Sequence, residues 1–143
     1  MDWYLAQKQT DQVRPLIDRI HDKGLPAGIA GHNPAVFEWA ETAGLPVDFY
    51  MCAYYNSAHR DHRAEHVSGM PEWFRDEDRE IRTALIQRLS KPVIHYKILA
   101  AGRNKPEAAF AYAASHMRPG DAACVGIFDK DDPQMLAKDV AML

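Results

Sequence analysis

The tripeptide Gly-Leu-Pro occurs twice in the chain, at residues 24–26 and 44–46. Each copy stands between a stretch with helical periodicity and a short apolar run. The glycine therefore ends a helix, and the run after it predicts a buried strand. Asn33 and Pro34 form a typical helix start between the two runs. This part of the chain predicts helices over about 10–23 and 34–44 and strands over 27–31 and 47–56.

The same alternation continues along the rest of the chain. Apolar residues at helical spacing include Ile81 and Phe110, which we expect to face the core. Strands that alternate with helices form a parallel sheet through right-handed crossovers. We therefore predict one α/β domain, residues 1–143, with four parallel strands. Its remaining elements are helices over about 77–89 and 106–116 and from about 133 onward, and strands within 91–103 and over 122–128.

Two architectures fit this order of elements, a small doubly wound sheet and half of a (β/α)8 barrel. The strands are short and each ends in polar residues, which favours the half (β/α)8 barrel. Four parallel strands cannot close by themselves, and their inner face would stay open to water. We therefore expect the chain to belong to a longer barrel or to complete one as a homodimer.

Charge and composition exclude some partners. The net charge is -3 and the pI is about 6.1, so neither a nucleic acid nor an anionic membrane is expected as a partner. No long apolar run and no signal-peptide pattern is present, so we expect a soluble cytoplasmic protein. Cys52 and Cys124 fall in predicted strands, where a free thiol acts as a small hydrophobe. We expect them to form neither a disulfide nor a metal site.

The segment Lys91–Arg103 carries two ionisable groups inside an apolar run. His95 and Lys97 are two residues apart, so on a regular strand they share one face. A lysine at the carboxyl end of a barrel strand could form a Schiff base with a carbonyl substrate, and His95 could move a proton. The alternative is a structural Lys97 that pairs with an acid or extends its charged end into water. We expect His95 and Lys97 to face the barrel interior, and Tyr96 to face the helices.

Polar residues follow two other predicted strands. His32 could bind a ligand or a metal, or act as an acid or base. Alternatively, His32 is a structural histidine and the adjacent Asn33 is a helix cap. Tyr55 and Asn56 could hold a sugar or a nicotinamide ring, or could be core residues before a turn. Ligands of α/β proteins gather at the carboxyl ends of strands, so these residues are candidates for one site.

Two loops carry groups of charged or metal-ligating residues. The run Gly102-Arg103-Asn104-Lys105 precedes a predicted helix, whose N-terminus and two cations could hold a phosphate; the alternative is an ordinary surface loop. The long polar stretch 57–72 contains three histidines separated by charged residues, which predicts a solvated loop rather than a zinc site. These histidines are His59, His62 and His66.

The strand ends also form an ordered set of motifs. The set consists of Gly28-Ile29-Ala30-Gly31-His32-Asn33-Pro34, Ala53-Tyr54-Tyr55-Asn56, Tyr96-Lys97-Ile98-Leu99-Ala100-Ala101-Gly102, and Gly126 followed by Asp132-Pro133-Gln134-Met135-Leu136. Over nearly the whole chain, this set resembles the C-terminal half of the aldo/keto reductase-like barrels. The corresponding family motifs are a Gly-Val-Ser-Asn strand end, a Tyr-Asn or Tyr-His pair, Tyr-Ser-Pro-Leu-x-x-Gly, and a closing glycine before a Pro-x-x-Leu helix.

The resemblance implies NADP as a cofactor, with Tyr96 stacked on its nicotinamide ring. Its other cofactor-binding residues would be Gly102, Arg103 and Lys130. Three differences indicate a divergent subfamily. The family's catalytic Asp, Tyr, Lys and His lie in the N-terminal half of the barrel, so none can be assigned here. Lys97 stands where the family has serine, and three aspartates around Lys130 would repel a 2′-phosphate.

Two classes of function follow. The first is an enzyme, an oxidoreductase or a Schiff-base lyase or isomerase, that acts on a carbonyl or sugar-like small molecule at the carboxyl ends of the strands. Its catalytic residues would be Lys97, His95 and His32, and its substrate-binding residues Asn33, Tyr55 and Asn56. The second is a non-catalytic half barrel that is stable only as a homo-oligomer or as part of a longer barrel.

Overall fold

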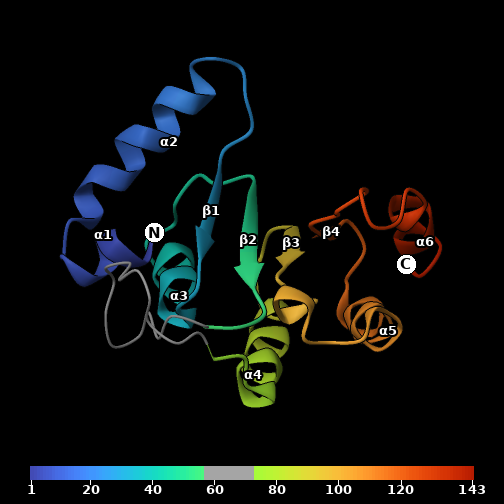
Figure 1. Cartoon of the computed structure of the whole chain (residues 1–143). Helices are drawn as coiled ribbons and strands as arrows, with labels where there is room; N and C mark the ends of the chain where they lie inside the picture. Colours follow the sequence, from blue (N-terminus) through green and yellow to red (C-terminus); the bar gives the residue numbers. More distant parts are fainter. Residues whose placement is uncertain (57–72) are drawn as a thin grey trace.

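The computed structural model describes residues 1–56 and 73–143 (Figure 1). Its helices are α1 (Asp2–Ala6), α2 (Val13–His21), α3 (Pro34–Thr42), α4 (Asp76–Ile86), α5 (Pro106–His116) and α6 (Met135–Val140). Two short 3-10 turns are η1 (Thr10–Gln12) and η2 (Ala100–Gly102). The strands are β1 (Gly28–Gly31), β2 (Phe49–Ala53), β3 (Val93–Tyr96) and β4 (Ala122–Cys124).

The strands form one parallel sheet in the order β1-β2-β3-β4. This spatial order is the chain order, whereas a doubly wound sheet reverses direction at a switch point. The predicted α/β fold with four parallel strands is therefore confirmed, and the architecture agrees with half of a (β/α)8 barrel. The sheet is not closed, because β1 and β4 are its two edges.

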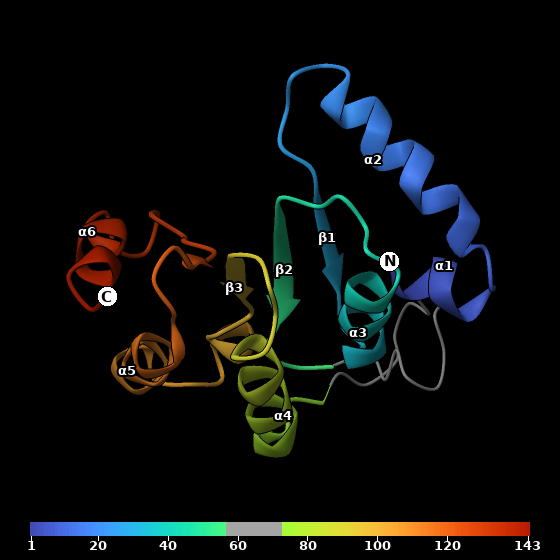
Figure 2. The ribbon, with the colours of Figure 1, turned by 180° about the vertical axis from the view of Figure 1, so that it is seen from behind.

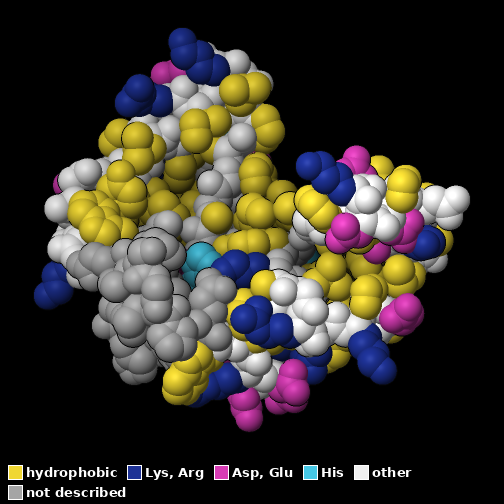
Figure 3. All heavy atoms as spheres, viewed as in Figure 1, with side chains coloured by type: hydrophobic (Ala, Val, Ile, Leu, Met, Phe, Trp, Pro, Cys, Tyr) yellow, Lys and Arg dark blue, Asp and Glu magenta, His cyan; other side chains and the backbone are white. Residues whose placement is uncertain are grey.

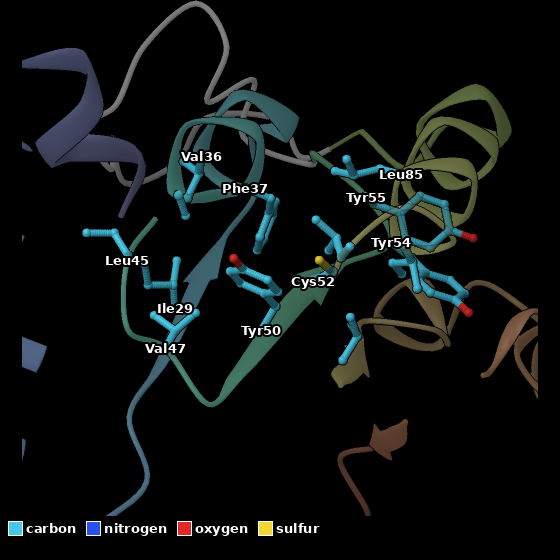
Figure 4. Close-up of a cluster of buried hydrophobic side chains, with 14 of the residues drawn as sticks. Ile29, Val36, Phe37, Leu45, Val47, Tyr50, Cys52, Tyr54, Tyr55 and Leu85 are labelled. Atoms are coloured by element: carbon cyan, nitrogen blue, oxygen red, sulfur yellow. The ribbon is translucent and has the colours of Figure 1, made fainter. Parts of the chain in front are cut away.

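The buried core lies between one face of the sheet and the helices that cover it. Ile29, Tyr50 and Val93 stand opposite one another in register, and none is more than 2% exposed. The Phe37 ring from α3 meets the Tyr50 ring edge-on, with centroids 5.7 Å apart (Figure 4). A Cβ at Gly31 would lie 3.1 Å from Val36 Cγ1, so the glycine lets α3 approach β1 closely. Figures 1 and 2 both show α3 beside β1.

The helix-end signals in the sequence are confirmed. The Asn33 side chain accepts a hydrogen bond from the Ala35 backbone N–H at 3.0 Å, and Pro34 begins α3. Gly24 and Gly44 have φ of +69° and +56°, the left-handed conformation that follows many helices. The expected helix over 106–116 is α5, with Phe110 fully buried.

Two expectations were wrong. Ile81 is 55% exposed, because the face of α4 that packs inward carries Arg82, Thr83, Leu85 and Ile86. The fourth strand stops at Cys124, and the apolar side chains of Ile127 and Phe128 beyond it are 45% and 55% exposed. β4 ends early because its pairing partner β3 ends at the same level.

Candidate functional site

A cavity of about 710 Å³ lies at the carboxyl ends of β3 and β4. Its wall is mostly apolar, with few polar groups, as is common for small-molecule sites. Phe74, Ile127 and Phe128 are among its apolar lining residues. The lining side chains with reactive or hydrogen-bonding groups are Tyr96, Lys97, Asn104, Cys124 and Asp139.

Lys97 reaches this cavity through a break in the strand. β3 ends at Tyr96, and Lys97 takes a left-handed φ of +60°. Ala100, Ala101 and Gly102 are also left-handed, with φ of +49°, +54° and +80°. Non-glycine residues in this conformation are strained, and such strain gathers at functional sites. Because the alternation of the strand stops here, Tyr96 and Lys97 both line the cavity, although they are adjacent in sequence.

The expected orientation of β3 was wrong. His95 is fully buried and stands in register with Cys52, on the same side of the sheet as Val93 and the helix-facing core. Tyr96, expected to face the helices, lines the cavity instead. The fold therefore does not bring His95 and Lys97 together in this cavity.

His95 can be buried on the helix-facing side because both ring nitrogens have partners. Its Nε2 lies 3.2 Å from Asp121 Oδ2, and its Nδ1 lies 2.9 Å from Tyr54 Oη. A carboxylate only accepts, so Nε2 carries the proton and Nδ1 accepts from the Tyr54 hydroxyl. Burial lowers the pKa of His95, against the opposing effect of Asp121. The histidine is therefore neutral, and its hydrogen bond to Asp121 links β3 to the turn before β4.

Asp121 is the centre of that network, and sequence reasoning missed it. Its carboxylate accepts from the Arg118 guanidinium and from the backbone N–H groups of Val93 and Arg118. Burial alone would raise the pKa of Asp121, but the hydrogen bonds from Arg118, Val93 and His95 outweigh it and lower the pKa to about 2. The available signal was an arginine and an aspartate flanking Pro119-Gly120, directly before a strand.

His32 lies beside the cavity rather than in its lining. Its backbone N–H donates to Asp2 Oδ1 at 2.9 Å, and its Nδ1 lies 3.3 Å from Asp2 Oδ2. Its ring stands edge-on to the Tyr96 ring, with centroids 6.1 Å apart. Arg82 donates to the His32 carbonyl oxygen. His32 thus meets the cavity lining at the Tyr96 ring.

Two ionisable groups of this cluster have shifted pKa values. Burial alone would raise the pKa of Asp2, but hydrogen bonds from the His32 side chain and from the backbone of Asn33 and His32 lower it to about 2. Burial, and then the negative charge of Asp2, raise the pKa of Tyr96 to about 12. The Tyr96 phenol therefore stays protonated near neutral pH and can donate a hydrogen bond.

The residues expected to bind substrate lie outside the cavity lining. Asn33 caps α3, so the alternative interpretation of this residue as a helix cap is the one that the structure supports. Tyr55 and Asn56 are 1% and 6% exposed. Tyr55 has an indirect role, because its Oη accepts from Asn104 Nδ2 at 2.7 Å and so fixes a residue that does line the cavity.

Two of the four expected cofactor-binding residues line the cavity. Tyr96 and Gly102 line the cavity, whereas Arg103 and Lys130 do not. The Arg103 guanidinium stacks 4.4 Å from the centre of the Phe74 ring, and its Nη1 donates to the Ala100 carbonyl. Lys130 is exposed in the segment between β4 and α6.

Sequence reasoning also missed Asp139 and the position of Cys124. Asp139 is buried on α6 and lines the cavity. Cys124 is an exposed free thiol that lines the cavity as well, whereas Cys52 is buried in the core. The spacing of Met135 and Asp139, which places both on one face of a helix, was the available signal for Asp139.

Two further findings concern residues 1–56 and 73–143 alone. In these ranges no group of three or more His, Cys, Asp and Glu side chains could hold a metal ion. None of the helices found there is long and apolar enough to cross a membrane. The stretch with His59, His62 and His66 lies outside the described residues. Comparison with family models, with curated proteins and with solved structures found no match to this chain.

Proposed function

We propose that this chain binds a small carbonyl compound in the cavity at the ends of β3 and β4, where the Lys97 amine forms a Schiff base with it. The observation that carries the proposal is the position of Lys97. It stands on strained, left-handed backbone at the carboxyl end of a parallel strand and lines a largely apolar cavity. The nucleophilic form of a lysine is its neutral amine.

The reaction uses groups that line the cavity and one proton from solvent. The neutral Nζ of Lys97 attacks the carbonyl carbon while the C=O electron pair moves to oxygen. Tyr96, kept protonated by its raised pKa, donates a hydrogen bond to that oxygen. Proton transfer from nitrogen to oxygen gives a neutral carbinolamine. Its hydroxyl group takes one further proton from solvent and leaves as water, which leaves an iminium ion on Lys97. The reaction class would be that of a lyase or isomerase.

Borohydride trapping tests the proposal. The protein is incubated with benzylacetone, an apolar ketone, and treated with sodium borohydride, whose hydride converts an iminium into a stable secondary amine. Peptide mass spectrometry should find the adduct on Lys97. Lys97→Met should lose it, whereas Lys105→Met, an exposed lysine outside the cavity lining, should keep it. Equal labelling of Lys97 and the surface lysines would overturn the proposal.

NADP binding and reductase activity stay predictions of the resemblance. Tyr96 and Gly102 lie where a cofactor in this cavity would touch them. Arg103 already stacks on Phe74, and Lys130 stands among Asp129, Asp131 and Asp132. A titration of NADPH fluorescence at high protein concentration tests the reductase function. Absence of NADPH binding would remove it and would leave the Schiff-base proposal standing, since that chemistry needs no nicotinamide.

We also propose that a second copy of the chain completes the sheet. A two-fold axis along the barrel would set β4 of each copy beside β1 of the other and make eight parallel strands. Exposed apolar side chains near both sheet edges support this arrangement, and Figure 3 shows hydrophobic side chains on the face between α2 and the C-terminal segment. These are Trp3, Leu16, Ile20 and Leu25 near β1, and Ile127, Phe128, Leu136, Val140 and Leu143 near β4.

Light scattering coupled to size-exclusion chromatography tests this assembly. The expected mass is twice the 16.2 kDa of the chain, and Leu136→Lys should shift it toward the monomer. A folded monomer at all concentrations would contradict the proposal.

A further inference from the structure

Helix α6 buries an aspartate and leaves two of its apolar side chains exposed. Asp139 is 8% exposed, whereas Leu136 and Val140 are 58% and 65% exposed. Met135 and Asp139, one helical turn apart, both line the cavity. A surface helix normally buries its apolar stripe and exposes its charges. This helix instead places a carboxylate against the cavity.

The fold itself gains little from that carboxylate. Asp139 Oδ2 is buried and has no hydrogen-bond partner among the residues that the structure describes. Asp139 also lies in the last turn of α6, where the helix dipole disfavours negative charge. Asp132, on the same segment, is different: Lys138 Nζ lies 2.5 Å from its Oδ2, and the Gln134 N–H donates to its Oδ1. A buried acceptor without a partner destabilises a fold unless something else supplies the donor.

We propose that Asp139 binds a hydrogen-bond donor of the ligand in this cavity. The inference rests on the proposed function, and it narrows the ligand to an apolar carbonyl compound that also carries a hydroxyl or ammonium group. The carbonyl group of this ligand reacts with Lys97, and its hydroxyl or ammonium group donates a hydrogen bond to Asp139. Its apolar body contacts side chains such as Phe74 and Phe128.

Two matched ketones test the donor directly. Benzylacetone and its para-hydroxy derivative differ by one hydroxyl group, and calorimetric titration without borohydride measures the affinity of each. A hydrogen bond to a charged acceptor favours the hydroxylated compound by roughly tenfold or more. In Asp139→Asn this preference should shrink to a small factor. In Asp132→Asn, the matched control, it should stay as in the wild type.

Thermal unfolding without any ligand gives a second, independent readout. Asp139→Asn keeps the size and the helix propensity of the side chain but removes its charge. The melting temperature of this variant should rise by about 2–4 °C. Asp132→Asn should lower it or leave it unchanged, because that carboxylate already has partners.

The outcomes separate this inference from the proposed function. A lower melting temperature for Asp139→Asn would mean that the carboxylate supports the fold, and this result overturns the inference. Equal affinities of the wild type for the two ketones, including no binding of either, overturn it as well. Lys97 trapping by borohydride is measured separately, so the proposed function stands if Lys97 is trapped and falls if it is not.

Discussion

The Nε2 atom of His95 lies 3.2 Å from Oδ2 of Asp121, and both side chains are fully buried. This contact joins the middle of β3 to the turn that leads into β4. Tyr54 completes the chain of groups by donating to the other ring nitrogen. The arrangement is part of the scaffold that places Tyr96 and Lys97, the next residues along the chain, at the cavity.

The burial of His95 and the hydrogen bonds of Asp121 make the fold sensitive to acid. Burial lowers the pKa of His95 in the folded state, so below a pH of about 6.5 the unfolded chain binds a proton that the folded chain resists. Stability is therefore full above that pH and is lost as the pH falls. Asp121 adds a further loss between its unfolded value of 3.8 and its folded value of about 2. Urea unfolding measured across this pH range checks the prediction.

The control for that experiment is His95→Gln. This variant should be less stable near neutral pH, but the part of the acid-induced loss that begins near a pH of about 6.5 should disappear. An unchanged slope of unfolding free energy against pH in the variant would show that other groups cause the loss.

Removing the Tyr54 hydroxyl should destabilise the protein. In Tyr54→Phe the buried Nδ1 of His95 loses its donor, so the free energy of unfolding should fall by about 1–3 kcal/mol. Tyr96→Phe is the matched control, because the Tyr96 hydroxyl makes no hydrogen bond within residues 1–56 and 73–143; its effect should stay within about 0.5 kcal/mol. Denaturant unfolding measures both. Equal losses in the two variants would argue against the assigned network.

The two cysteines should differ sharply in reactivity. Cys124 is exposed and lines the cavity, whereas Cys52 is buried and burial raises its pKa to about 12. We expect N-ethylmaleimide to modify Cys124 in the folded protein and to leave Cys52 intact until urea is added. Mass spectrometry locates the adducts. Modification of Cys124 should also block borohydride trapping on Lys97. Unimpaired trapping would show that the ketone reaches Lys97 without occupying the part of the cavity beside Cys124.

Glycine should stabilise the strained turn after β3. Ala101 is exposed and has φ of +54°, a conformation that costs alanine about 1–2 kcal/mol. Ala101→Gly should therefore raise the free energy of unfolding by about 0.5–1 kcal/mol, after the extra entropy of glycine in the unfolded chain is subtracted. Ala111→Gly, an exposed position within α5, should lower it by about 1 kcal/mol. A loss at both positions would mean that the turn is unstrained.

The alternation of elements could be predicted because its signals are local. Asn33 and Pro34 start α3, and Gly24 and Gly44 end helices, through interactions with residues one or two turns away. The orientation of β3 could not be predicted in the same way. The alternation of Ile94 and Tyr96 with His95 and Lys97 predicted the opposite orientation, because it did not show that distant residues satisfy a buried His95.

The sequence by itself determined the order of helices and strands, their parallel direction and the glycine and asparagine positions that end or begin helices, because backbone conformation and periodicity act over a few residues. Only the tertiary structure decided which side chains meet. Asp121 lies 26 residues from His95, and its hydrogen bond offsets the free-energy cost of burying the histidine ring. Lys97, which follows β3, and Asp139, on α6, line one cavity, and no spacing in the chain encodes that meeting.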